Sequence, residues 1–136
     1  MKKYKFLLVA SNFYPEITLN LLKGAQKYLE KNGHKFDTFY TKGSLEIPTM
    51  ISIKLDKHTY DAVVAIGCII KGKTDHYEFI SSAITKTLLE LSIEKKLPIS
   101  NSVLNCNNMK QAKDRSSDKI NRAKEAVEAA IEVLKN

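Results

Sequence analysis

The chain alternates between short apolar runs and longer segments whose apolar residues recur at helical spacing. The run KFLLVA (5–10) is continuous and apolar, which is typical of a strand covered on both faces. From Thr18 onward, apolar residues return every three or four positions, which predicts a helix. Asn32 and Gly33 then close that helix as a C-terminal cap would.

The same alternation continues along the whole chain. It predicts strands at 5–10, 34–40, 61–70 and 98–105, and helices at 18–31, 48–55, 74–96, 108–113 and 118–134. In the long helix over 74–96, the apolar residues expected on one buried face are Phe79, Ile80, Ala83, Ile84, Leu88 and Leu91. Strict strand-helix alternation with buried strands favours an α/β fold, here a flavodoxin-like three-layer α/β/α sandwich with a four-stranded parallel sheet.

Ligands of such sheets bind at the carboxyl ends of the strands. Four loops should therefore meet at one edge: 11–16, 41–46, 71–76 and 105–107. With 136 residues, 43% of them hydrophobic, the chain is expected to form one domain over 1–136.

The formal charge is +7, from 22 Lys and Arg against 15 Asp and Glu, which suits anionic partners. The lysines are scattered, and no zinc-finger spacing or aromatic-rich basic strand is present, so nucleic acid is not expected as a partner. The apolar run near the start is too short for a signal peptide, and no stretch approaches a membrane span. We expect a cytoplasmic protein without a membrane partner.

The two cysteines, Cys68 and Cys106, are far apart in sequence and form no C-x-x-C pair, so a metal site or redox motif is not expected. Cys68 lies in an apolar run and is interpreted as a small buried residue. Among the histidines, His34 and His58 lie at turns between elements and are interpreted as surface residues.

GCIIKGKT, from Gly67 to Thr74, matches the phosphate-binding pattern of P-loop nucleotidases. The context argues against that function, because Cys68-Ile69-Ile70 continues a strand where a P-loop must turn. An acidic residue for Mg²⁺ at the end of another apolar strand is also missing. Lys73 and Thr74 still precede a helix, where free N–H groups favour an anion; Thr74 or Asp75 as a simple helix cap is the alternative.

Other candidate residues occur at the same predicted edge. His76 lies in the first turn of a helix, and a histidine there suits proton transfer near pH 7. Phe13 is either a stacking platform for a flat ligand or a loop anchor in the core. Glu46 is either an acceptor for ligand hydroxyls or a cap of the second predicted helix, over 48–55. Arg115 is either a phosphate ligand or a solvated charge.

Taken together, these blocks resemble a known family along almost the whole chain. The sequence is similar to the 6,7-dimethyl-8-ribityllumazine synthases of riboflavin biosynthesis in SNFYPEIT, KGSLEIP, AIGCIIKGKTDHYEFI and LPISNSVLNCNNMKQAKDRS. The third block is the most specific and contains the whole P-loop match. One departure is Asn101, which stands where many members carry Phe.

The resemblance implies a role for each matching residue. Phe13 would stack on the pyrimidinedione ring, the segment Ser44, Leu45 and Glu46 would hold the ribityl chain, and the backbone of Ile69 and Ile70 would contact the polar edge of the heterocycle. Lys73 and Thr74 would bind the phosphate of the second substrate. His76 would transfer protons. Arg115 would contact the phosphate from a neighbouring subunit, and Asn101 would face the ligand from there.

The reaction that the resemblance implies joins 5-amino-6-ribitylamino-uracil to 3,4-dihydroxy-2-butanone 4-phosphate, with loss of phosphate and water. Every step is a proton transfer or a charge neutralisation, so neither a metal nor a redox cofactor is expected. The family forms homopentamers, in some members decamers or sixty-subunit shells, with shared sites, and riboflavin synthase is an implied partner. Two other classes remain open, a non-catalytic module that binds flavin or lumazine and a P-loop nucleotidase.

Overall fold

The fold is a four-stranded parallel sheet with strand order β2-β1-β3-β4, seen in a computed structural model that describes residues 2–73 and 76–136. Its elements are β1 (Lys5–Ser11), α1 (Pro15–Lys31), β2 (Lys35–Thr41), the 3-10 turn η1 (Ser44–Glu46), α2 (Ile47–Lys57), β3 (Ala62–Ile70), α3 (Tyr77–Lys95), β4 (Ile99–Cys106), α4 (Met109–Arg115) and α5 (Arg122–Lys135). The predicted α/β class and the parallel four-stranded sheet are confirmed.

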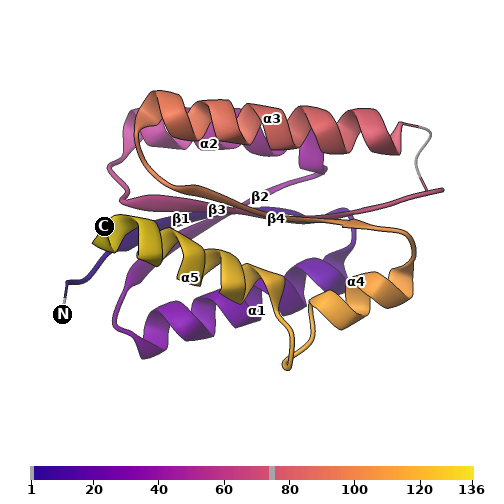
Figure 1. The fold of residues 1–136 in the computed structure, drawn as a ribbon, viewed down its shortest axis with the longest axis horizontal. Coiled ribbons are helices and arrows are strands. Elements are labelled where there is room, and N and C mark those ends of the chain that lie inside the picture. The colour runs from indigo at the N-terminus through magenta and orange to yellow at the C-terminus, as the bar shows by residue number, and fades with distance from the viewer. Residues whose placement is uncertain (1, 74–75) are drawn as a thin grey trace.

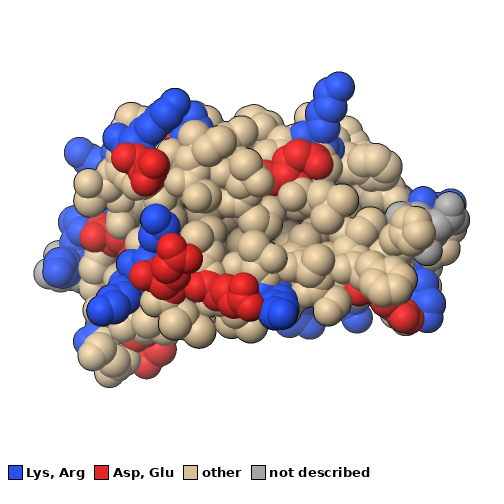
Figure 2. Space-filling view, turned by 90° about the horizontal axis from the view of Figure 1, so that it is seen from above, with Lys and Arg blue, Asp and Glu red and all other residues tan. Residues whose placement is uncertain are grey.

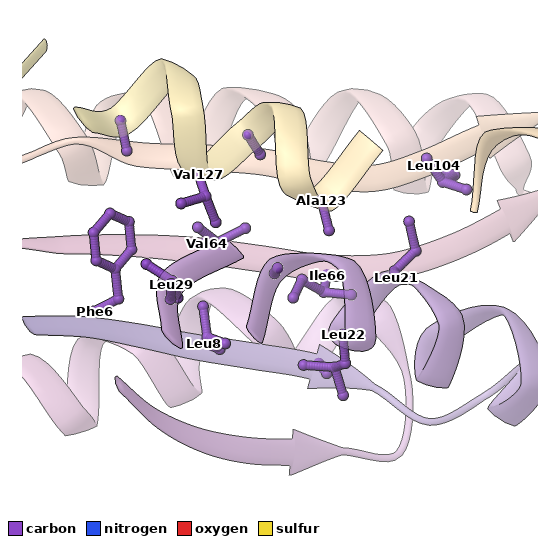
Figure 3. Close-up of a cluster of buried hydrophobic side chains, with 14 of the residues drawn as sticks. Phe6, Leu8, Leu21, Leu22, Leu29, Val64, Ile66, Leu104, Ala123 and Val127 are labelled. Atoms are coloured by element: carbon purple, nitrogen blue, oxygen red, sulfur yellow. The ribbon is translucent and has the colours of Figure 1, made fainter. Parts of the chain in front are cut away.

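Helices cover both faces of the sheet (Figure 1). α2 and α3 lie on one face, and α1, α4 and α5 lie on the other. β3 is the centre of the core, because all nine of its residues are buried. Figure 3 shows side chains of α1 and α5 meeting those of β1 and β3, where Leu22, Val64 and Val127 belong to one continuous cluster.

The predicted strands agree with the observed ones to within about one residue, whereas three helices begin three or four residues from their predicted starts. α3 begins at Tyr77, three residues after its predicted start. α1 begins at Pro15, three residues before the predicted start, because proline fits the first turn of a helix. α5 begins at Arg122 and not near Asp118. Asn121 caps it, accepting from Lys124 N at 3.0 Å while donating to Asn20 O at 2.9 Å.

The prediction for the buried face of α3 was partly wrong. Ile84 and Leu88 are buried as expected, but Phe79 is 78% exposed and Ala83 is also exposed. At 100° per residue, Phe79 points almost opposite to Ile84. α3 therefore carries a second apolar face, directed away from the sheet.

The interpretation of His34 as a surface residue was wrong. Its side chain is buried, and Nδ1 accepts a hydrogen bond from Tyr4 N at 3.0 Å. The parallel register pairs Lys5 with Lys35, so the residues before them, Tyr4 and His34, also face one another. His58, by contrast, is exposed as expected.

Across the described residues, no helix combines the length and the apolar character that a membrane crossing requires.

Candidate active site

A pocket of about 180 Å³ opens at the carboxyl edge of the sheet. It is lined by Phe13, Tyr14, Gly43, Ser44, Leu45, Glu46, Cys68, Ile69, Ile70, Lys73 and Ile80. Three of the four predicted loops contribute, those after β1, β2 and β3. The pocket therefore forms where parallel α/β sheets bind ligands.

The floor of the pocket is the end of β3, which extends beyond its neighbour β1. In the described residues, β1 pairs with β3 as far as Ala10 and Ile66, whereas β4 pairs with it up to Ile70. Residues 67–70 therefore present one edge of backbone N–H and C=O groups that no strand occupies. Such an edge is suited to the polar rim of a flat ligand. The match to the P-loop pattern does not form a P-loop, because Cys68, Ile69 and Ile70 belong to a strand and not to a loop.

Gly67 allows η1 to approach this edge closely. A methyl group at Gly67 would lie 3.1 Å from the Ser44 hydroxyl oxygen and 3.2 Å from Ser11 Cβ, tighter than ordinary contacts. Glu46 stabilises the same turn, because its Oε1 accepts from Gly43 N at 2.9 Å. Glu46 is thus a cap of η1 and also lines the pocket. The alternative that its side chain caps the second helix was wrong, because Glu46 precedes α2 without a side-chain hydrogen bond to it.

Phe13 stands over the mouth of the pocket. Its side chain is 65% exposed, and its ring meets Tyr14 edge-on with centroids 5.1 Å apart. A loop anchor in the core would be buried, so this exposure excludes that interpretation, and stacking on a flat ligand stays a prediction. Burial, with a smaller contribution from Cys68, raises the pKa of Tyr14, so its phenol lines the pocket as a neutral donor.

Beyond β3, the chain turns with Gly72 at φ +83° and Lys73 N donating to Ile70 O at 3.2 Å. Lys73 lines the pocket, and α3 begins four residues later, after His76. His76 is exposed at the N-cap of α3, with its ring 6.3 Å from that of Phe79. It follows the pocket-lining Lys73 in sequence without itself lining the pocket. Thr74 lies outside the described residues.

Asn101 and Arg115 lie elsewhere, along a groove on the outer side of β4. Asn101 is held by Val103 N, which donates to its Oδ1 at 2.9 Å. Because β4 is the edge strand, this groove and the pocket lie on different sides of one subunit. The structure thus gathers Phe13, Ser44, Leu45, Glu46, Ile69, Ile70 and Lys73 in one pocket, but does not bring Asn101 or Arg115 to it within one chain.

Four lining residues escaped the sequence analysis: Tyr14, Gly43, Cys68 and Ile80. Tyr14 follows Phe13 directly, so its place in the loop after β1 could have indicated it. Cys68 and Ile80 belong to apolar patterns whose simplest interpretation is core, and nothing in those patterns marks the end that faces a ligand.

Comparison with known proteins identifies the family of this chain. The family model described as 6,7-dimethyl-8-ribityllumazine synthase matches residues 3–136. The chain belongs to this family.

Named members of the lumazine synthase family are similar to this chain along most of their length. A 6,7-dimethyl-8-ribityllumazine synthase of Bartonella tribocorum is 39% identical over 132 residues, which cover 96% of this chain and 87% of that protein. Those of Afipia carboxidovorans and Nitrobacter hamburgensis are 34% and 36% identical, over 96% and 95% of this chain and 84% and 83% of their own lengths.

Proposed function

We propose that this chain condenses 5-amino-6-ribitylamino-uracil with 3,4-dihydroxy-2-butanone 4-phosphate to form 6,7-dimethyl-8-ribityllumazine. Membership of the lumazine synthase family supports the proposal, and the pocket carries it. An exposed aromatic ring, a free strand edge and a cation before a helix suit a flat heterocycle beside a phosphate. The reaction belongs to riboflavin biosynthesis, a pathway of soluble enzymes, and we place the protein in the cytoplasm.

The two substrates would lie side by side in the pocket. The pyrimidinedione would stack on Phe13 and direct its polar edge to the backbone of Ile69 and Ile70, with the ribityl chain along Ser44, Leu45 and Glu46. The phosphate would lie at Lys73, near the N-terminus of α3, where unpaired N–H groups and the helix dipole favour an anion. Holding two reactants together is itself worth several orders of magnitude in rate.

The chemistry then needs little more than proton transfer. The amine attacks the ketone and forms an imine with loss of water, and phosphate is then eliminated. The ribitylamino nitrogen attacks the remaining carbonyl and closes the ring with loss of a second water. His76 is the residue that we expect to move protons, and acid/base catalysis of this kind contributes roughly 10²–10⁴-fold. Lys73 and Arg115 would stabilise the charge on the leaving phosphate. No step in this scheme calls for a metal or a redox cofactor.

We further propose that the working form is a homopentamer with sites shared between neighbours. The pocket of one chain, about 180 Å³, is smaller than the roughly 300–1,000 Å³ of typical ligand pockets. The groove with Asn101 and Arg115, on the far side of β4, would complete the pocket of the next subunit. Figure 2 shows the face of α2 and α3, whose middle is largely uncharged, and α3 exposes Phe79, Leu89 and Ile93 there.

The decisive experiment mixes the purified protein with both substrates and follows the formation of the coloured, fluorescent lumazine. A rate well above that without protein supports the proposal, and a rate equal to the background contradicts it. Tight flavin binding without turnover would instead indicate a binding module. Phosphate release that requires ATP and Mg²⁺ would indicate a nucleotidase.

A further inference from the structure

Two buried thiols lie between the pocket and Arg115, and the proposed reaction uses neither. Cys68, on β3, lines the pocket. Cys106, the last residue of β4, is fully buried and pairs in register with Ile70. Both are free cysteines in the same core cluster. They connect the pocket on one side of the sheet edge with the guanidinium on the other.

Arg115 contacts one sulfur and two oxygen acceptors. Its Nη1 lies 3.6 Å from Cys106 Sγ, 3.5 Å from Asn105 O and 3.5 Å from Gln111 Oε1. Gln111 is itself fixed, because its Oε1 also accepts from Asn107 N at 2.8 Å. The four ion pairs that the described residues form do not include Arg115. The guanidinium is therefore oriented by sulfur and oxygen acceptors. Its positive charge forms no ion pair among the described residues and can attract an anionic ligand.

The pKa values of the two thiols are shifted in opposite directions, and the lower pKa of Cys106 favours its contact with Arg115. A hydrogen bond from Cys68, and then the nearby Arg115, lower the pKa of Cys106 against the effect of its burial. The same hydrogen bond and burial raise the pKa of Cys68. The sulfur of Cys106 thus acts as an acceptor toward Arg115.

We propose that Cys106 is a positioning residue, whose sulfur, backed by the Cys68 thiol, fixes the Arg115 guanidinium in the orientation that receives the substrate phosphate. The inference rests on the proposed function for the identity of that phosphate. The inference goes beyond the proposed function, because it assigns a role to a core residue that touches neither substrate. An alkyl side chain of similar size would fill the same space but could not accept the hydrogen bond.

The test compares Cys106→Val with Cys106→Ser. The valine variant should raise KM for the butanone phosphate about fivefold to tenfold, the size of one weak hydrogen bond to a charged group. KM for the uracil substrate and kcat should change by less than about twofold. The serine variant keeps an acceptor and should recover most of the loss. Equal changes in both KM values, or no recovery with serine, would contradict the proposal.

A double-mutant cycle separates this role from a general loosening of the core. If Cys106 acts through Arg115, adding Cys106→Val to Arg115→Ala should cause no further rise in KM for the phosphate substrate. Additive effects would overturn the proposal. Val127→Ala, in the same cluster but on α5, is the matched control. It should lower the melting temperature and leave both KM values unchanged.

Calorimetry with inorganic phosphate makes the test independent of turnover. Weaker phosphate binding by Cys106→Val than by the unaltered protein supports the positioning role, even if the protein forms no lumazine and the proposed function fails. Equal phosphate binding by both proteins, together with normal lumazine formation, overturns the positioning role and leaves the proposed function standing.

Discussion

At the scale of single residues, the site joins residues that sequence motifs identify with residues that only the fold reveals. Phe13 and Lys73 belong to recognisable blocks, and the pocket contains both. Glu46 had two interpretations, as an acceptor for ligand hydroxyls or as a cap of the second helix. Its carboxylate instead accepts from Gly43 N and caps η1, and the residue also lines the pocket. Cys106 could not be assigned from sequence, because its neighbour Arg115 is nine positions away and meets it only through the turn between β4 and α4.

Replacing His76 by Ala should slow lumazine formation by roughly 10²–10⁴-fold at saturating substrate, because the variant lacks the proton carrier. His76 is exposed, so the melting temperature should stay within a few degrees of that of the unaltered protein. His58→Ala, also at an exposed histidine, is the control and should turn over normally. Wild-type turnover by His76→Ala would refute the role in proton transfer.

Phe13→Ala should raise KM for the uracil substrate about tenfold or more, because stacking on an aromatic ring contributes about 1–3 kcal/mol per base. The exposed Tyr40, on the edge strand β2, provides the control Tyr40→Ala. Steady-state kinetics with each substrate varied in turn would measure the effect. An unchanged KM for the uracil would show that the ring does not stack on the substrate.

At the scale of elements, continuous apolar runs were enough to predict β1 and β3, because nearly all residues of these two strands are buried. The edge strand β2, by contrast, is only partly buried. Helix starts were less predictable, since they depend on partners distant in sequence. α5 begins where Asn121 bonds to Asn20, 101 positions away. The second apolar face of α3 was also missed, because its spacing overlaps with that of the buried face. Sequence periodicity cannot tell which face the sheet covers.

Gly67→Ala tests the close approach between β3 and η1. The added methyl must displace Ser44 or Ser11, which we expect to cost about 1–3 kcal/mol in the free energy of unfolding. KM for the uracil substrate should rise as well, because the displaced turn lines the pocket. Urea denaturation and kinetics would measure the two effects. A stable variant with normal KM would mean that the turn relaxes freely.

His34 links the segment before β1 to the start of β2 and should make stability depend on pH. Burial, followed by the charges of Lys3 and Lys135, lowers its pKa. Below about pH 6.5, His34 therefore binds a proton more readily in the unfolded chain than in the folded chain. This contribution to stability is complete above that pH and is lost as pH falls through the folded-state pKa.

The measurement is the free energy of unfolding in urea at several pH values on either side of about 6.5. His34→Asn keeps an acceptor near the position of Nδ1 but cannot titrate, so it should flatten the pH dependence over this range. The same slope in both proteins would show that other groups cause it.

At the scale of the whole molecule, one chain carries a pocket and a separate groove on opposite sides of β4. The family resemblance led to the expectation that Arg115 acts from a neighbour. Neither hydrophobic patterning nor motif spacing could have placed it on the far side of the edge strand. Assembly is a property of surfaces, and the exposed apolar residues of α3 become visible as a surface only once the helix is packed on the sheet.

The double variant Leu89→Lys, Ile93→Lys should shift the protein toward smaller species, because both side chains are exposed on the outer face of α3. Light scattering after size-exclusion chromatography would give the mass. Val133→Lys, at an exposed position on α5, is the matched control and should keep the assembly. Turnover should fall together with the mass, since separated subunits would lose Arg115 of the neighbour. An unchanged mass would place the interface elsewhere.

The overhang of β3 beyond β1 has a consequence for how such proteins can diversify. The residue pairs between β1 and β3 end at Ile66, and the edge of β3 that β1 leaves unpaired begins at Gly67. Substitutions around Phe13 or Leu45 can change what lies along that edge without disturbing the paired part of the strand. The scaffold is therefore a suitable starting point for engineering receptors for other flat heterocycles, with recognition altered in two loops and folding left intact.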